Sequence, residues 1–83
     1  MAEVVVYTRS LCGFCSAVKN LLNMKNVTFK ELDGTYDTKI RQEMMDRSGR
    51  TTFPQVFVDG KHIGDCDEVH SLDDAGKLDA LLA

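Results

Sequence analysis

Two cysteines, Cys12 and Cys15, stand three positions apart, at the point where the pattern of the chain changes. Residues 4–7 before them form a short apolar run typical of a buried strand, and residues 14–22 after them place apolar side chains at helical spacing. A C-x-x-C motif between a strand and a helix is typical of thiol–disulfide exchange. The first cysteine would lie at the helix N-terminus, where unpaired N–H groups and a partial positive charge favour the reactive thiolate. The motif therefore predicts redox chemistry, with Cys12 as the nucleophile and Cys15 close enough to attack it in turn.

The size and charge of the chain narrow the class of protein further. Its 83 residues suffice for one domain with a modest core, and the formal net charge of −3 argues against nucleic acid as the main partner. No apolar run approaches the roughly 20 residues that a membrane span needs, and the first residues lack the basic region of a signal peptide. Three cysteines, an odd number, fit catalysis or metal binding in a reducing compartment better than a disulfide framework. We therefore expect a cytoplasmic protein that contacts neither nucleic acid nor membrane.

The rest of the chain supplies the elements that must position the two thiols. The expected strands are Val4–Tyr7, Val27–Leu32, Gln55–Val58 and Lys61–Gly64. The expected helices run over Gly13–Met24, over the stripe of Tyr36, Ile40 and Met44 with a stop at Gly49, from near Asp67 to Ala75, and over Leu78–Leu82. Right-handed crossovers make the first two strands parallel, and a two-residue turn makes the last two antiparallel. The order β-α-β-α-β-β-α predicts an α/β fold with a four-stranded mixed sheet flanked by helices.

Three segments at fixed separations carry a resemblance to a known family. They are residues 7–15 (YTRSLCGFC), residues 52–55 (TFPQ) and residues 64–68 (GDCDE). Together they resemble a glutaredoxin, most closely the short bacterial dithiol members, and the likeness extends over residues 1–83 as a single domain. The resemblance implies a thioredoxin fold and an enzyme, a glutathione–disulfide oxidoreductase. Such an enzyme reduces protein–glutathione mixed disulfides and protein disulfides, with glutathione as co-substrate.

The resemblance also implies a role for the catalytic residues and for the only proline. Cys12 would be the nucleophile and Cys15 the resolving thiol. The peptide bond before Pro54 would be cis and would lie next to the active cysteine. The backbone N–H and C=O of Phe53 would then pair, like a strand, with the cysteine of a bound disulfide.

A glutathione site follows by the same resemblance, because glutathione carries two carboxylates and one ammonium. Asp67 would bind the γ-glutamyl ammonium, and the N–H groups of Cys66 and Asp67 would hold its α-carboxylate at a helix start. Arg9 and Arg41 would approach the glycyl carboxylate, and Phe14 would also contribute to the site. Taken alone, Asp67 would be interpreted as a helix N-cap and Arg41 as a solvated charge.

Three positions depart from the commonest family pattern. Gly13 and Phe14 replace the usual Pro-Tyr between the thiols. Phe53 replaces a valine, which makes the wall of the site bulkier. Asp65 replaces a glycine just before the amides that would hold glutathione. Its added negative charge should weaken glutathione binding, although a side chain facing solvent would have little effect.

Two other functions remain open. Some glutaredoxins bind an iron–sulfur cluster as a dimer, through the cysteine at the position of Cys12 in each subunit and two glutathiones. A proline after that cysteine disfavours such a cluster, and this chain has Gly13 at that position. A structural zinc module would use Cys12 and Cys15 together with His62 and Cys66, although the intervening sequence is far longer than in compact zinc modules. Otherwise we expect a monomer whose partners are glutathione and disulfide-containing proteins, with ribonucleotide reductase as one conceivable client.

Overall fold

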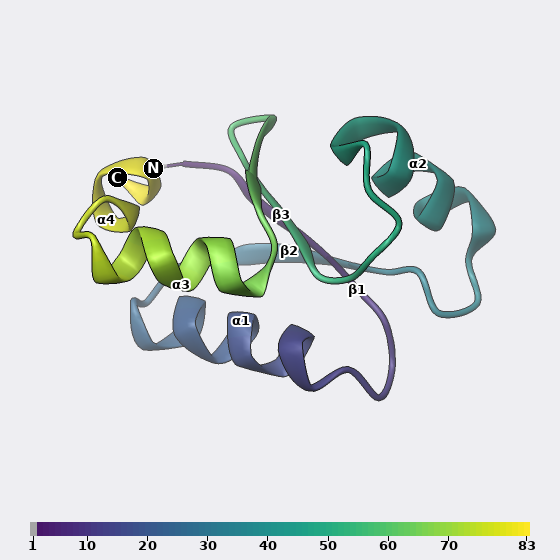
Figure 1. Cartoon of the computed structure of the whole chain (residues 1–83), viewed down its shortest axis with the longest axis horizontal. Coiled ribbons are helices and arrows are strands. Elements are labelled where there is room, and N and C mark those ends of the chain that lie inside the picture. The colour runs from purple at the N-terminus through teal and green to yellow at the C-terminus, as the bar shows by residue number, and fades with distance from the viewer. Residues whose placement is uncertain (1) are drawn as a thin grey trace.

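The computed structural model describes residues 2–83, which form a sheet with helices on both faces (Figure 1). The strands are β1 (Val4–Thr8), β2 (Phe29–Asp33), β3 (Gln55–Val58) and β4 (Lys61–Gly64). The helices are α1 (Gly13–Met24), α2 (Thr38–Ser48), α3 (Cys66–Asp74) and α4 (Leu78–Leu82). The strand order is β2-β1-β3-β4, with β1 parallel to β2, β1 antiparallel to β3, and β3 antiparallel to β4. The predicted four-stranded mixed sheet is therefore confirmed.

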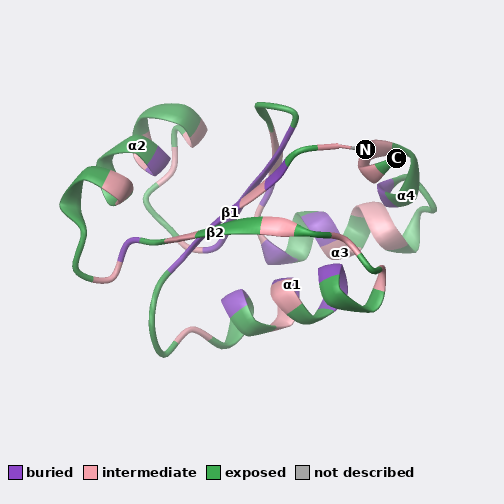
Figure 2. Cartoon of the chain, turned by 180° about the vertical axis from the view of Figure 1, so that it is seen from behind, coloured by how far each residue is buried: buried purple, intermediate pink, exposed green. Residues whose placement is uncertain are grey.

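The central strand β1 is apolar along its length because both of its faces are covered. Val4 and Val6 pack into one core cluster with residues of α1, α3 and α4. On the other face, Tyr7 packs with Met44 of α2 and Phe57 of β3 in a second cluster. Figure 2 shows the buried positions concentrated on β1 and on the inner surfaces of the helices. The two cores hold the end of β1, and hence the loop that carries Cys12, in a fixed place.

Two expected boundaries are wrong, each for a local reason. The second strand begins at Phe29 instead of Val27, because the chain leaves α1 through a turn in which the Val27 N–H donates to the Leu22 carbonyl at 3.0 Å. Tyr36 is 96% exposed and lies outside the second helix, which begins after the N-cap Asp37. The third helix begins at Cys66, close to the expected start near Asp67, and Asp65 is its N-cap.

The remaining elements follow the predicted pattern. α1 has the predicted bounds, and β3 and β4 are joined through Asp59 and Gly60, which both have positive φ. Leu78 of α4 is fully buried against the first core, so the last helical turn closes one end of that core. None of the helices in the described chain has the length and apolar character needed to cross a membrane.

Candidate active site

Cys12 is the N-cap residue of α1, as its position in the motif predicts. Its backbone is extended (φ −121°, ψ 104°), and its Sγ accepts a hydrogen bond from the backbone N–H of Cys15 at 3.1 Å. Sulfur here takes the part that a serine or aspartate oxygen plays at other helix starts. The thiol is half-buried and can be reached by a substrate. A negative charge on this sulfur is therefore stabilised by an N–H group and by the helix N-terminus.

Cys15 lies one turn further into α1, and its surroundings are different. Its side chain is only 2% exposed, and burial raises its pKa to about 12, with a further contribution from its hydrogen bond with Cys12. Cys15 therefore stays protonated at neutral pH. The cysteines are free thiols in the described chain, so the structure corresponds to the reduced form.

The segment before β3 brings the backbone of Phe53 to the nucleophile. The Phe53–Pro54 peptide bond is cis, as the resemblance implies, and Pro54 is buried. The Phe53 carbonyl oxygen lies 4.0 Å from Cys12 Sγ. The bulky Phe53 ring finds room because Gly34 lies against it; a Cβ at position 34 would come within 3.1 Å of the ring.

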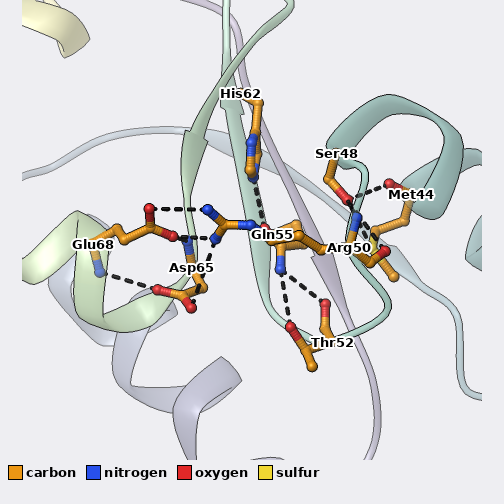
Figure 3. A network of polar contacts seen from close by, with 8 residues as sticks. All are labelled: Met44, Ser48, Arg50, Thr52, Gln55, His62, Asp65 and Glu68. Carbon is orange, nitrogen blue, oxygen red and sulfur yellow. Dashed lines mark hydrogen bonds and ion pairs between the residues drawn. The ribbon is translucent and has the colours of Figure 1, made fainter.

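The same segment is held from behind by the buried side chain of Gln55 (Figure 3). Gln55 Nε2 donates to the Thr52 carbonyl at 3.1 Å and to the Thr52 hydroxyl at 3.2 Å. Its Oε1 lies 2.7 Å from His62 Nε2 on β4. The backbone that faces Cys12 is thus tied to the adjacent strand.

A groove of about 570 Å³ runs past the segment that contains Phe53 and Pro54. It is lined by Arg9, Phe14, Arg41, Thr51, Thr52, Phe53, Pro54, Asp65, Cys66 and Asp67. The structure therefore brings together every residue that the resemblance implicates in glutathione binding. Three further residues, Thr51, Thr52 and Asp65, line the groove although the resemblance gives them no role there. Thr52 and Asp65 lie inside the family motifs and so carried a signal, whereas nothing in the sequence singled out Thr51.

The groove presents charges of both signs. Arg41 Nη2 donates to the carbonyls of Gly34 and Thr35, at 3.2 Å each, which holds the guanidinium beside the loop after β2. Arg9 comes from the loop after β1 and makes one weak contact, with the Ser10 carbonyl at 3.5 Å. Asp67 is an exposed residue in the first turn of α3. A ligand with both carboxylate and ammonium groups finds complementary charges here.

The start of α3 differs from the expectation for Asp67 taken alone. The N-cap is Asp65, whose carboxylate accepts the Glu68 N–H at 3.0 Å, while Glu68 Oε1 accepts the Asp65 N–H at 3.2 Å. This capping box leaves Asp67 without a capping role. Asp65 does not simply face solvent, because its carboxylate serves the helix.

Cys66 opens α3 and is buried among apolar side chains. Burial raises the pKa of its thiol, and the negative charges of Asp67 and Asp65 raise it further. Its Sγ lies 3.5 Å from His70 Nδ1 on the next turn. Cys66 is therefore a protonated thiol in the wall of the groove.

The zinc module does not assemble in this structure. Within residues 2–83 no three His, Cys, Asp or Glu side chains come together with the geometry of a metal site. His62 instead bonds to Gln55, and its ring lies 5.1 Å from that of Phe57.

Comparison with known proteins agrees with this geometry. The sequence profile of the Glutaredoxin family matches residues 4–63. Glutaredoxin 3 of Escherichia coli K12 is 49% identical over 82 residues, covering 99% of each chain. The solution structure of a glutaredoxin from Brucella melitensis is 46% identical, with a TM-score of 0.87, covering 99% of this chain and 89% of that one. The crystal structure of a buckwheat glutaredoxin–glutathione complex is 32% identical, with a TM-score of 0.89, covering 98% of this chain and 76% of that one. The fold is thus the thioredoxin fold, and the chain belongs to the glutaredoxin family.

Proposed function

We propose that this glutaredoxin reduces protein–glutathione mixed disulfides and protein disulfides at the expense of glutathione, with Cys12 as nucleophile and Cys15 as resolving thiol. Thiol–disulfide oxidoreductase activity in general follows from the family. One observation carries the more specific reaction: the groove, whose wall includes Phe53 with its carbonyl oxygen 4.0 Å from Cys12 Sγ, unites two guanidinium groups, the carboxylate of Asp67 and the start of α3. These are complementary to the charged groups of glutathione.

The first step is the attack of the Cys12 thiolate on the glutathione sulfur of a mixed disulfide. A new S–S bond forms between Cys12 and glutathione, the old S–S bond breaks, and the client thiolate leaves and takes up a proton. The N–H of Cys15 and the helix N-terminus stabilise the attacking sulfur. The backbone of Phe53, 4.0 Å from Cys12 Sγ at its carbonyl oxygen, would align the incoming disulfide.

The enzyme returns to the dithiol form by one of two routes. A second glutathione thiolate attacks the glutathionyl sulfur on Cys12, which releases oxidised glutathione and regenerates the Cys12 thiolate. With a protein disulfide as substrate, the Cys12 thiolate first attacks one client sulfur, which forms a Cys12–client mixed disulfide and releases the other client sulfur as a thiolate that takes up a proton. Cys15 then loses its proton to solvent and attacks the Cys12 sulfur, which breaks the mixed disulfide, releases the second client sulfur as a thiolate that is protonated in turn, and leaves a Cys12–Cys15 disulfide. Two glutathiones then reduce that disulfide. Cys15 suits this later role because it remains a protonated, buried thiol until Cys12 is oxidised.

Glutathione would bind in the groove with each of its charged groups next to a protein group of the opposite charge or to backbone N–H donors. Asp67 would take the γ-glutamyl ammonium, and the N–H groups of Cys66 and Asp67 would hold the adjacent carboxylate. Arg9 and Arg41 would approach the glycyl carboxylate, and the rings of Phe14 and Phe53 would form apolar walls. The buckwheat glutaredoxin, which shares this fold, forms a complex with glutathione in its crystal structure.

The cellular location, oligomeric state and clients of the protein are proposed from the family resemblance. We expect the protein to act as a cytoplasmic monomer on glutathionylated or disulfide-containing clients, of which ribonucleotide reductase is one candidate. Gel filtration at micromolar concentration would show the expected monomer.

The test is a glutathione-coupled reduction of a glutathionylated peptide and of a protein disulfide, with wild type, Cys12→Ser and Cys15→Ser. The proposal predicts that Cys12→Ser loses both activities. It predicts that Cys15→Ser keeps the first activity and loses the second. Equal loss of both activities in the two variants would contradict the two routes.

A second function, glutathione-ligated iron–sulfur cluster binding by a dimer, is favoured by the surroundings of Cys12. Gly13 keeps the backbone N–H that a proline would remove, and a Cβ at position 13 would meet no atom within 4 Å. Beside Cys12, Leu11 is 100% exposed and Phe14 is 65% exposed, which leaves apolar surface free for a second subunit. Cys12 and glutathione would supply thiolate ligands to the cluster. The bound cluster could then be used for electron transfer or be passed on to another protein.

Anaerobic reconstitution with iron, sulfide and glutathione tests this second function on wild type and Gly13→Pro. We expect visible absorbance and dimer formation in wild type and their suppression in Gly13→Pro, with deglutathionylation retained in both. Absence of a cluster in wild type would leave a plain dithiol reductase. Equal cluster content in the two proteins would show that position 13 does not control assembly.

A further inference from the structure

Two walls of the groove, residues 51–54 and residues 65–67, come from different parts of the chain. Residues 51–54 precede β3 and residues 65–67 follow β4, so the antiparallel pairing of β3 with β4 places both at one edge of the sheet. The register of this pair shifts between Val56 and Phe57, close to that edge. The pairing at this edge is therefore irregular, and side-chain contacts add to it in setting the spacing of the two walls.

Arg50 lies immediately before the first wall and reaches the start of the second (Figure 3). Its two terminal nitrogens contact the two carboxylate oxygens of Glu68; Nη1 bonds to Oε1, and Nη2 lies 3.1 Å from Oε2. Nη1 also lies 3.8 Å from Asp65 Oδ2. Such a two-point contact fixes orientation as well as distance. Arg50 itself does not line the groove.

Both ends of this contact are anchored. The Arg50 N–H donates to Ser48 Oγ at 3.0 Å, and Ser48 Oγ donates to the Met44 carbonyl at 2.6 Å, which ties Arg50 to the end of α2. On the other side, the stem of Glu68 lies over Gly64, where φ is +130° and an added Cβ would come within 2.5 Å of Glu68 Cβ. Glu68 Oε1 also accepts the Asp65 N–H. The Glu68 carboxylate is therefore held in place by contacts that do not involve Arg50.

We propose that the Arg50–Glu68 ion pair, with Asp65 beside it, is a positioning device that sets the spacing of the two groove walls and so tunes recognition of the glutathionyl group. The inference rests on the proposed function, because it concerns how that groove binds glutathione. The ion pair also places a positive charge beside Asp65, the acidic residue that stands in the groove where the family commonly has glycine. Arg50 and Glu68 act through the walls and touch neither substrate nor Cys12.

The ion pair is present across the pH range of any assay. The pKa of the Glu68 carboxyl is lowered to about 2, mainly by its hydrogen bond with Arg50. Variation of pH therefore cannot test the device, and substitution must. Glu68→Gln is the sharpest change, because glutamine can keep the capping box while the charge is lost.

The experiment measures the second-order rate constant of Cys12 with two disulfides, in a Cys15→Ser background so that the reaction stops at the mixed disulfide. Oxidised glutathione carries the groups that the groove would recognise, and hydroxyethyl disulfide lacks them. Arg50→Ala and Glu68→Gln should each slow the reaction with oxidised glutathione by about threefold to tenfold, a modest effect because the ion pair is solvent-exposed. Both should leave the rate with hydroxyethyl disulfide within about twofold. The double variant should be no slower than the single ones, because both changes remove one interaction.

The sign of the Glu68→Gln effect separates this device from simple attraction of glutathione by Arg50. Releasing Arg50 and removing a negative charge would accelerate the reaction if Arg50 attracted glutathione directly, whereas the positioning device predicts a slower reaction. Lys25→Ala is the matched control. It breaks an ion pair with Asp73, at 2.6 Å, and with Asp79, at 2.7 Å, and should lower the thermal midpoint without changing either rate constant.

Unchanged or faster reaction of Glu68→Gln with oxidised glutathione would overturn the inference, as would equal slowing with both disulfides. Failure of the proposed function would look different. In that case the parent protein itself would react with oxidised glutathione no faster than with hydroxyethyl disulfide.

Discussion

Two cysteines of the same chemical type have been given opposite properties by their positions in one helix. Cys12 is the N-cap at the start of α1, partly exposed, with an N–H group directed at its sulfur. Cys15 is 2% exposed and its pKa is raised to about 12 by burial. Under the proposed mechanism this difference suits Cys12 to the attack and Cys15 to the resolving step, and it follows from the three-residue spacing of the motif.

Asp67 is the groove residue whose role is easiest to test. Asp67→Ala should raise the apparent KM for a glutathionylated peptide about tenfold or more, because a charge-assisted hydrogen bond contributes about 1.5–3 kcal/mol. The value of kcat should change less, because Asp67 is not a reacting group. Steady-state kinetics with Asp67→Asn as the matched variant would check it. An unchanged KM in a folded Asp67→Ala protein would leave Asp67 as a solvated charge.

At the scale of elements, the starts of two helices present the nucleophile and one wall of the groove. α1 presents Cys12 at its N-cap, and α3 presents its first N–H groups at the other wall of the groove. The start of α3 is fixed by the capping box of Asp65 and Glu68. The residue that departs from the family glycine is therefore also the residue that caps the helix.

This assignment makes a prediction about stability. Asp65→Ala should lower the free energy of unfolding by about 1 kcal/mol, the usual effect of removing an N-cap side chain. Asp65→Asn should stay close to wild type, because asparagine caps equally well. Urea denaturation of the three proteins measures the difference. Equal stability of Asp65→Ala and wild type would show that the cap contributes nothing.

For the whole molecule, the sheet and its two cores could be predicted from the sequence to a large extent. The run Val4–Tyr7 indicated a strand buried on both faces, and Asp59-Gly60 indicated the hairpin, because both signals are local. Tyr36 was misplaced in a helix because its spacing to Ile40 fits a turn of helix, although its side chain is exposed in the loop. The prediction that the second strand begins at Val27 was wrong because the Val27 N–H donates to the Leu22 carbonyl of α1 instead of to a neighbouring strand.

The candidate site was predictable wherever it coincides with family motifs, and less so elsewhere. The separations of residues 7–15, 52–55 and 64–68 pointed to one groove, and the fold brings these segments together. The Arg50–Glu68 ion pair had no such signal, because its partners are 18 residues apart and meet only through the pairing of β3 with β4. Long-range contacts between surface side chains leave no periodic pattern in a sequence.

Burial of ionisable groups predicts how the whole protein responds to alkali. The pKa of Cys15 is about 12 in the folded protein and 9.0 for an ordinary thiol, so between these values the folded state holds a proton that the unfolded state has lost. Stability due to this group is complete below about pH 9 and falls as the pH rises toward 12. The pKa values of Tyr7 and Cys66 are raised as well, which acts in the same direction.

Urea midpoints measured between about pH 8 and pH 10.5 with a non-thiol reductant would check this response. We expect the midpoint of wild type to fall with rising pH and that of Cys15→Ser to fall less steeply. Parallel curves for the two proteins would show that Cys15 is not a source of the alkaline instability.

The central claim is that the glutathionyl group is transferred to Cys12 and to no other thiol. The most direct measurement is mass spectrometry of Cys15→Ser after brief mixing with a glutathionylated peptide, with Cys12→Ser, which keeps Cys15 and Cys66, treated in parallel. We predict one glutathionyl group on Cys15→Ser, located at Cys12 by peptide mapping, with stoichiometric release of the free peptide thiol, and none on Cys12→Ser. A glutathionyl group at Cys66, equal labelling of Cys12→Ser, or attachment of the peptide instead of glutathione would contradict the account.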